Sequence, residues 1–445
     1  MVFGSFEKWQ VLTFTLTFLC MSSRHICLES YFIVKPEVHN SMGFSTTWLG
    51  AMDATYLFFY ALGNFVCGSL GDNIPLKYVI SGGMVLTSFG YALISMLGYV
   101  DAKYPWLFII IFGFVGVFQS TVWPGTVAVM GNWFSKTHRG KIIGSWSSNS
   151  FVGDILGAQL GSLLLSQAGF AWESVVISAA TILLCVSILF YFVSKERPGP
   201  EFEQVKKSIQ LVEPGEEMFE EAPKKKKGIS FWKAWKLPGV TVYALTYGCV
   251  KLLNYSMIMW LPYFLDKHID VSTSLIGTMA NFYDLGALFG GFGIGWVTDK
   301  LGIRAPFVCI MLFLALPTLG IIQLMTPGLW WMFFIINIFL GFFIGGSDIL
   351  ISGVISTDLG KNEQIKNEEA LATVTGIIDG TGGAGASLGQ VIIGVLAIWS
   401  WDLVFGFMFC VGVLAVTLLL KYAIRDVKLY IQQKKLGAKV LSGVE

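Results

Sequence analysis

The chain has 445 residues, of which 54% are hydrophobic and only 13% are charged, and its formal net charge is +1. A soluble globule of this composition would have more apolar surface than its interior could hold. The composition therefore excludes an ordinary soluble domain and indicates a protein that crosses a membrane many times. The first apolar run is too long for a cleavable signal peptide, and no small-residue cleavage site follows it.

Apolar segments of about 20 residues recur along the chain and predict twelve membrane-spanning helices in two sets of six. The first set is expected at residues 10–33, 47–70, 78–98, 104–130, 141–165 and 172–194. The second set is expected at residues 241–266, 273–298, 305–325, 329–356, 370–398 and 401–425. The predicted fold is an all-α membrane protein with an N-terminal half at 1–194 and a C-terminal half with its tail at 241–445.

Residues 195–240 change to charged sequence, including "EPGEEMFEEAPKKKKG", and predict a solvated linker; a lipid-headgroup contact for its lysines is the alternative. Most of the 30 Lys and Arg residues fall on the side of the predicted topology that holds this linker and both termini. Lys35, Lys103 and Lys267 are assigned to the opposite side. The positive-inside rule therefore predicts cytosolic termini and leaves Arg24 and Lys251 as the cations within spans.

The two halves repeat at an offset of 227 residues, which aligns residues 45–72 with 272–299 and Arg24 with Lys251. The aligned glycines and aspartates are Gly68, Asp72, Gly295 and Asp299. Their Gly-x-x-x-Asp pattern resembles the loop motif of major facilitator transporters, in which the Asp caps a neighbouring helix. Parallel six-helix repeats predict alternating access around a midplane site.

A second alignment, at an offset of 232 residues, pairs Gly153 with Gly385 and Gly157 with Gly389. Glycine at every fourth position lets two helices approach closely. We therefore expect the fifth and eleventh spans to be tightly packed helices that move against their neighbours.

Arg24 and Lys251 are the main candidates for substrate binding. A cation inside a bilayer needs an anionic partner or an aqueous cavity. One interpretation is a structural ion pair in which Glu29, Asp53 or Asp284 neutralises either cation. The other is an anionic substrate, for which Arg supplies a bidentate fork and Lys a point charge.

Further polar residues lie within the predicted spans. Gln119 and Trp123 are four residues apart and are expected on one helix face as a hydrogen-bonding group and an aromatic wall. Asn254 and Tyr255 follow Lys251 by one turn. Coupling or counterion roles are assigned to Glu29, His25, Asp348 and Asp284. Asp53, Asp154 and Asp379 also lie in spans, and among the aspartates within spans we expect some to hold helices together and one or two to bind protons.

Catalytic signatures are missing from the sequence. No Gly-rich phosphate loop follows a strand, and the four His and seven Cys residues have no metal-ligand spacing. We expect no enzyme activity, no metal, no cofactor and no nucleic-acid partner, with the cysteines reduced.

Three strings carry a resemblance to a known family: "QSTVWPGTVAVMGNWFSKTHRGKIIGSW" (119–146), "KLLNYSMIMWLPYFL" (251–265) and "EALATVTGIIDGTGGAGASLGQ" (369–390). They resemble the eukaryotic sugar-phosphate exchangers of the organophosphate:phosphate antiporter family, within the major facilitator superfamily. The resemblance implies exchange of a phosphorylated sugar or glycerol phosphate for inorganic phosphate across an endomembrane. It also implies pocket roles for Gln119, Trp123, Lys251, Asn254 and Tyr255.

Helix one departs from the family pattern. The family's Arg-Lys pair aligns with Leu28 and Glu29, so Arg24 replaces the missing Arg from one turn away, or phosphate exchange is lost. A substrate-facing His of the fifth helix in several members aligns with Asn149.

The leading functional hypothesis is an organophosphate:phosphate antiporter in an intracellular organelle membrane, the endoplasmic reticulum or the endolysosomal system. Two alternatives remain open. One is a proton-coupled or facilitative carrier of another small polar solute, and the other is a transport-inactive subunit that assembles with other membrane proteins.

Overall fold

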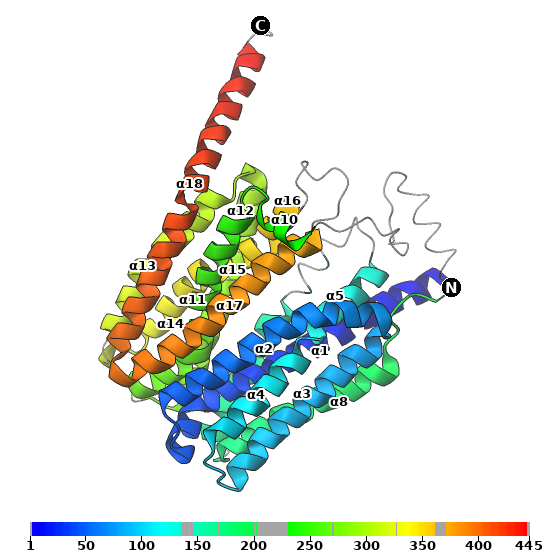
Figure 1. Cartoon of the computed structure of the whole chain (residues 1–445), viewed down its shortest axis with the longest axis vertical. Helices are drawn as coiled ribbons and strands as arrows, with labels where there is room; N and C mark the ends of the chain where they lie inside the picture. The colour runs from blue at the N-terminus through cyan, green and yellow to red at the C-terminus, as the bar shows by residue number, and fades with distance from the viewer. Residues whose placement is uncertain are drawn as a thin grey trace. The chain divides into compact units, whose positions relative to one another are not determined.

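The computed structural model describes residues 2–134, 142, 146, 148–166, 169–199, 202, 230–268, 271–325, 327–360 and 371–442. The side chains of residues 2–5, 65–73, 299, 327, 357, 360, 371, 372 and 434–442 are not described. Helices dominate the described residues, which contain no strand (Figure 1). The chain divides into two compact units, Met1–Lys225 with Val271–Thr278, and Lys226–Asp270 with Met279–Glu445.

The first unit contains seven described helices. They are α1 (Val2–Met42), α2 (Thr46–Asn73), α3 (Leu76–Tyr99), α4 (Pro105–Gln119), α5 (Val122–Trp133), α7 (Asn149–Ser166) and α8 (Trp172–Val193). α1 packs along α7 and α8, α2 packs along α4, and α3 packs along α8. In this arrangement the charged side chains of Arg24, Glu29 and Lys35 on α1 are buried.

The second unit is built around α11 and α17. Its α-helices are α10 (Phe231–Trp235), α11 (Val240–His268), α12 (Thr273–Leu301, from Met279 onward), α13 (Ala305–Leu324), α14 (Met332–Leu340), α15 (Gly346–Ile349), α16 (Ser356–Gly360), α17 (Leu371–Trp399) and α18 (Trp401–Ser442). A 3-10 turn spans Pro327–Leu329, and π-helical segments span Gly341–Gly345 and Leu350–Ile355. α11 packs on α17, and α13 packs on α18.

Eight described helices are long and apolar enough to cross a membrane. They cover Phe6–Met42, Leu76–Tyr99, Pro105–Trp133, Trp172–Val193, Ala305–Leu324, Met332–Ile355, Thr373–Trp399 and Trp401–Gln433. The predicted spans at 47–70, 141–165, 241–266 and 273–298 correspond to α2, α7, α11 and α12. These four are rich in Gly, Ser, Thr, Asn and charged residues, which lower their mean hydropathy.

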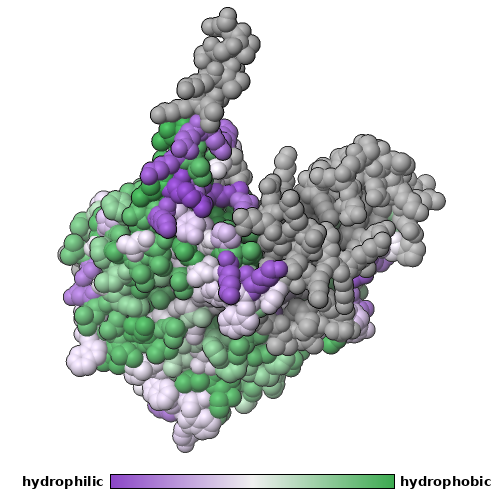
Figure 2. Space-filling model, turned by 45° about the horizontal axis from the view of Figure 1, so that its top comes forward, coloured by the Kyte–Doolittle hydropathy of each residue, from purple (hydrophilic) through white to green (hydrophobic). Residues whose placement is uncertain are grey.

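Large apolar side chains are exposed along the helices. Phe192 is 77% exposed, Leu324 80% and Trp399 77%. Figure 2 shows hydrophobic residues over much of the visible face. Exposing this much apolar surface to water would be unfavourable, so these faces are suited to contact with lipid.

The glycines that the sequence alignment paired lie at matching helix contacts. A Cβ on Gly153 of α7 would come within 2.5 Å of the Ser22 carbonyl oxygen of α1, and a Cβ on Gly385 of α17 within 2.4 Å of the Gly248 carbonyl oxygen of α11. Each glycine therefore lets its helix touch the backbone of its neighbour. This confirms the predicted close approach within each unit.

Candidate functional site

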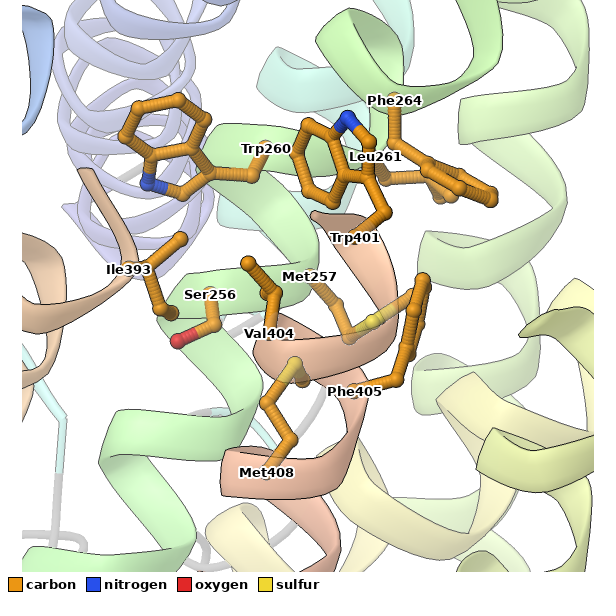
Figure 3. A pocket seen from close by; sticks show the side chains of 10 residues that line it. All are labelled: Ser256, Met257, Trp260, Leu261, Phe264, Ile393, Trp401, Val404, Phe405 and Met408. Carbon is orange, nitrogen blue, oxygen red and sulfur yellow. The ribbon is translucent and has the colours of Figure 1, made fainter. Parts of the chain in front are cut away.

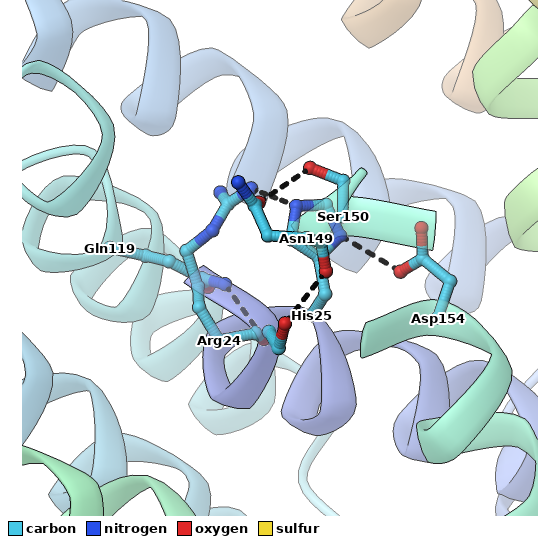
Figure 4. A network of polar contacts seen from close by, with 7 residues as sticks. Arg24, His25, Gln119, Asn149, Ser150 and Asp154 are labelled. Atoms are coloured by element: carbon cyan, nitrogen blue, oxygen red, sulfur yellow. Dashed lines mark hydrogen bonds and ion pairs between the residues drawn. The ribbon is translucent and has the colours of Figure 1, made fainter. Parts of the chain in front are cut away.

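A polar cluster lies in the first unit where α1 meets α7 (Figure 4). The Arg24 guanidinium donates a hydrogen bond to Nε2 of His25, and Nδ1 of His25 donates to Oδ1 of Asp154 over 2.8 Å. The side chains of His25 and Asp154 are only 14% and 9% exposed. Arg24 is buried as well. The cluster therefore links a cation to an anion through an imidazole inside the helix bundle.

Neighbouring helices complete the surroundings of Arg24. Gln119, the last residue of α4, donates from Nε2 to the Arg24 carbonyl oxygen over 3.3 Å. The ring of Tyr60 from α2 lies 5.6 Å from Cζ of Arg24. Asn149 begins α7, where its carbonyl oxygen accepts a hydrogen bond from Ser22 over 2.9 Å. Arg24 thus has neighbours from α2 and α4, while α7 is hydrogen-bonded to α1 at Ser22.

Gln119 ends α4, and Trp123 lies in the first turn of α5. The helix is interrupted between Gln119 and Val122 because the Pro124 ring conflicts with the carbonyl group four residues earlier, at Ser120. Gln119 is fully buried, whereas Trp123 is 38% exposed and packs on Trp146, with ring centroids 5.4 Å apart. Gln119 contacts the backbone of Arg24, whereas Trp123 contacts Trp146. The expected shared face of Gln119 and Trp123 stays a prediction.

A second buried ion pair lies farther along α1. Lys35 and Asp53 of α2 form a salt bridge and are 0% and 1% exposed at their side chains. The helix that carries Lys35 runs past the predicted end of the first span, through Pro36 to Met42, while the side of the membrane assigned to Lys35 stays a prediction. Asp53 is therefore the partner of Lys35, not of Arg24 or Lys251.

Glu29 lies on α1, two positions after Cys27, and is 2% exposed. A Cβ on Gly157 of α7 would come within 3.0 Å of the Glu29 Cβ, so Glu29 faces the α1–α7 contact. The geometry places it on the same helix pair as the Arg24 cluster.

In the second unit, Lys251 of α11 forms a salt bridge with Asp379 of α17, with 2.6 Å between Nζ and Oδ1. The Lys251 side chain is 9% exposed and that of Asp379 is 44% exposed. The rings of Tyr247 and Tyr255 lie 5.4 and 5.7 Å from Nζ of Lys251. Lys251 is therefore paired directly with a carboxylate, which the sequence left without a role.

Asn254, one turn after Lys251, accepts a hydrogen bond from the Tyr283 hydroxyl over 2.6 Å. Asp348 lies on α15 between the two π-helical segments, and its Oδ1 has no hydrogen-bond partner among the described residues. Such π-helical turns often accompany functional residues in helices. Asp284 of α12 is buried in the same unit.

The loop motif falls largely outside what the structure describes. The side chains of Asp72 and Asp299 are among those not described, so the predicted capping role of these aspartates stays a prediction. Gly295 lies in α12 with open space where a Cβ would be.

An apolar pocket in the second unit lies among α11, α17 and α18 (Figure 3). Its walls include Trp260, Phe264, Trp401, Phe405 and Met408. The one hydroxyl in its lining, that of Ser256, donates to the Leu252 carbonyl oxygen over 2.6 Å. Among the described residues no charged group lines this pocket, so its lining is unsuited to an anion.

Sequence reasoning missed the pairings of Asp154 and Asp379. In the second alignment these aspartates are seven residues apart, about two helical turns, and therefore lie on the same face of equivalent helices. This shared face was a signal for both partners, since each packs against the helix that carries the buried cation.

Comparisons with known proteins agree on the family. The model of the Major Facilitator Superfamily matches residues 13–366 and 267–442. "Sugar phosphate exchanger 3" of Mus musculus is 33% identical over 415 residues, which cover 88% of this chain and 83% of the relative. "Putative glycerol-3-phosphate transporter 2" of Arabidopsis thaliana is 32% identical over 454 residues, covering 95% and 88%.

A solved structure shares the fold. It is a bacterial homologue of the human lysosomal transporter Spinster in an inward-facing, unoccupied conformation, with a TM-score of 0.74 at 16% identity, covering 94% of this chain and 98% of that one. The chain is thus an integral membrane protein of the Major Facilitator Superfamily.

Proposed function

We propose that this protein is an organophosphate:phosphate antiporter that exchanges a sugar phosphate or glycerol phosphate for inorganic phosphate by alternating access. The observation that carries the proposal is the buried guanidinium of Arg24 in an apolar bundle. A cation in such a place requires an anionic partner. The names of relatives that match over most of their length support a phosphorylated substrate.

Arg24 is the residue that would hold the phosphoryl group. Its planar guanidinium matches two phosphate oxygens, which a lysine does not. Gln119 supports this role because its Oε1 is buried without a hydrogen-bond partner among the described residues and is available to a substrate hydroxyl. Asn149 and Trp123 lie at the ends of α7 and α5 and would add polar and aromatic contacts.

The second unit would contribute its own cluster. Lys251 supplies the charge, and Asn254 and Tyr255 supply hydrogen-bonding groups on the same helix. The carboxylates of Glu29, Asp284 and Asp348 would serve as counterions when no anion is bound. Asp379, which already neutralises Lys251, joins this set.

The cellular arrangement follows the charge pattern. We propose six-helix halves at 1–194 and 241–445 joined by a cytosolic linker, with cytosolic termini, in an organelle membrane. Gly68, Asp72, Gly295 and Asp299 would form the cytosolic loop motif of both halves.

Counterflow in proteoliposomes tests the exchange. Purified protein with internal inorganic phosphate should take up labelled phosphate, glycerol 3-phosphate or glucose 6-phosphate faster than phosphate-free vesicles do. Arg24→Ala should abolish this stimulation. Arg425→Ala is the matched control, because Arg425 is exposed on α18 beside Asp426. Uptake that ignores internal phosphate would contradict the antiport proposal.

A further inference from the structure

The imidazole of His25 is held at both ring nitrogens by groups of opposite charge (Figure 4). We propose that His25 Nε2 is a proton-binding site opened by the anionic substrate, so that binding of one anion is linked to binding of one proton. This inference rests on the proposed function, because it requires an anion at Arg24.

The hydrogen-bond directions fix the protonation state of the ring. A guanidinium has donors only, so Nε2 of His25 must accept from Arg24 with its lone pair. The single ring proton is then on Nδ1, which donates to Asp154. In this arrangement His25 is neutral, and a second proton has no place to bind.

The charged and titratable groups around the ring explain why the empty site stays in this form. Arg24 precedes His25 on α1, Asp154 faces it from α7, and Tyr60 of α2 lies against Arg24. Glu29 lies farther along α1, and α4 contributes only the neutral Gln119. A proton on Nε2 would place an imidazolium within hydrogen-bonding distance of the Arg24 guanidinium, and two positive charges this close repel each other.

An anion reverses this preference. A phosphoryl group that takes the donors of Arg24 withdraws them from Nε2, which leaves the lone pair of Nε2 beside an anion. A proton from water can then bind Nε2. The resulting imidazolium donates to Asp154 through Nδ1 and to the anion through Nε2. One proton is gained and no covalent bond other than the new N–H changes.

Thermodynamic linkage makes the effect reciprocal: if the anion favours the proton, the proton favours the anion by the same factor. Asp154 is essential to this behaviour, because its carboxylate stabilises the imidazolium. The burial of both side chains keeps bulk water from weakening the coupling.

Calorimetric titration of the purified full-length protein tests the inference. The probes are inorganic phosphate and glycerol 3-phosphate at about pH 7.5, where both are mainly dianions, in buffers that differ in ionisation enthalpy. The slope of the observed enthalpy against the buffer enthalpy gives the protons taken up. The anion's own loss of protons on binding is common to both proteins, so we expect the unmodified protein to take up about one proton more per bound anion than His25→Gln, which retains binding.

His39→Gln is the matched control. His39 is on the same helix, donates to the Phe44 carbonyl oxygen over 2.6 Å, and lies outside the cluster. Its proton uptake should equal that of the unmodified protein. Asp154→Asn should also reduce uptake, and it supplies the test if His25→Gln does not fold. The ¹⁵N shifts of His25 should change from a neutral to an imidazolium pattern when phosphate is added.

The outcomes separate the two proposals. Anion binding without proton uptake, or equal uptake in His25→Gln, overturns the proton site and leaves the proposed exchange standing. Failure of both probes to bind overturns the proposed function and the proton site together.

Discussion

The two compact units neutralise their buried cations in different ways. In the first unit Arg24 reaches Asp154 through the imidazole of His25, and in the second Lys251 contacts Asp379 directly. The carboxylates also differ in accessibility, since the side chain of Asp154 is 9% exposed and that of Asp379 is 44% exposed. In the first cluster a titratable ring therefore lies between cation and carboxylate, whereas the second is a direct pair whose carboxylate is half-exposed.

The Lys35–Asp53 pair provides a third case within the first unit. Both side chains are almost completely buried, so no ligand can reach them without helix separation. Accessibility thus distinguishes a structural pair from pairs that an incoming anion can open. Under the proposed function Arg24 and Lys251 would serve the substrate, while the fully buried Lys35 joins α1 to α2 through Asp53.

Removing the carboxylate of the buried Lys35–Asp53 pair should have the largest effect. Asp53→Asn leaves the buried Lys35 without its counterion and should lower the free energy of unfolding by about 3–5 kcal/mol. The double variant Lys35→Met with Asp53→Leu should recover most of this loss, because no buried charge remains. Denaturation in detergent, followed by a double-mutant cycle, measures both. If Asp53→Asn is as stable as the unmodified protein, the Lys35–Asp53 pair does not hold α1 to α2.

Conservative exchange of Arg24 or Lys251 should have the next largest effect. Arg24→Lys removes one of two charge-assisted hydrogen bonds to a phosphoryl group, each about 1.5–3 kcal/mol, so phosphate exchange should fall roughly 10–100-fold. Lys251→Arg keeps its charge beside the half-exposed Asp379 and should lose less. Counterflow rates in proteoliposomes compare them. Equal losses would show that the two units bind substrate in the same way.

The two units are alike in the close helix contacts that their glycines allow. Gly385→Ala would press a Cβ against the Gly248 carbonyl oxygen, and Gly153→Ala against that of Ser22. Each should destabilise the protein by about 1–3 kcal/mol, as overpacking does. Gly376→Ala is the control variant. No atom lies within 4 Å of the Cβ position at Gly376, and Ala is more favourable than Gly inside a helix. Melting temperatures in detergent report the difference.

The helical membrane fold could be predicted from composition because apolar segments of spanning length have few other uses. The end of the first span could not. Residues after Lys35 are polar and include Pro36, which usually ends a helix, yet α1 continues to Met42. Lys35, Val38 and Met42 are buried, whereas Glu37, Asn40 and Ser41 are exposed, so one face of this last part of α1 packs in a way that the sequence pattern did not reveal.

The cations of the site were evident in the sequence, because charge within an apolar span is expensive and therefore conspicuous. Their partners were not evident. Arg24 meets His25 and Asp154, and Lys251 meets Asp379, through packing of α1 on α7 and α11 on α17. Periodicity shows which residues share a face of one helix, but it does not give the vertical register between two helices.

Removal of Asp379 should have the smallest effect and bears most directly on the role of Lys251. Asp379 is half-exposed, so Asp379→Asn should change the free energy of unfolding by only about 0–1 kcal/mol, as for other exposed pairs. If Asp379 competes with a bound anion for Lys251, its loss should also raise phosphate affinity, by up to about fivefold for the same energy. Asp154→Asn in the first unit should not raise affinity, because His25 still accepts from Arg24 and loses the carboxylate that stabilises its imidazolium. Phosphate titration of both variants measures this contrast. A tighter Asp379→Asn beside a weaker Asp154→Asn would assign Lys251 to substrate attraction and Asp154 to the proton, whereas unchanged affinity in Asp379→Asn would make the Lys251–Asp379 pair a structural contact between α11 and α17.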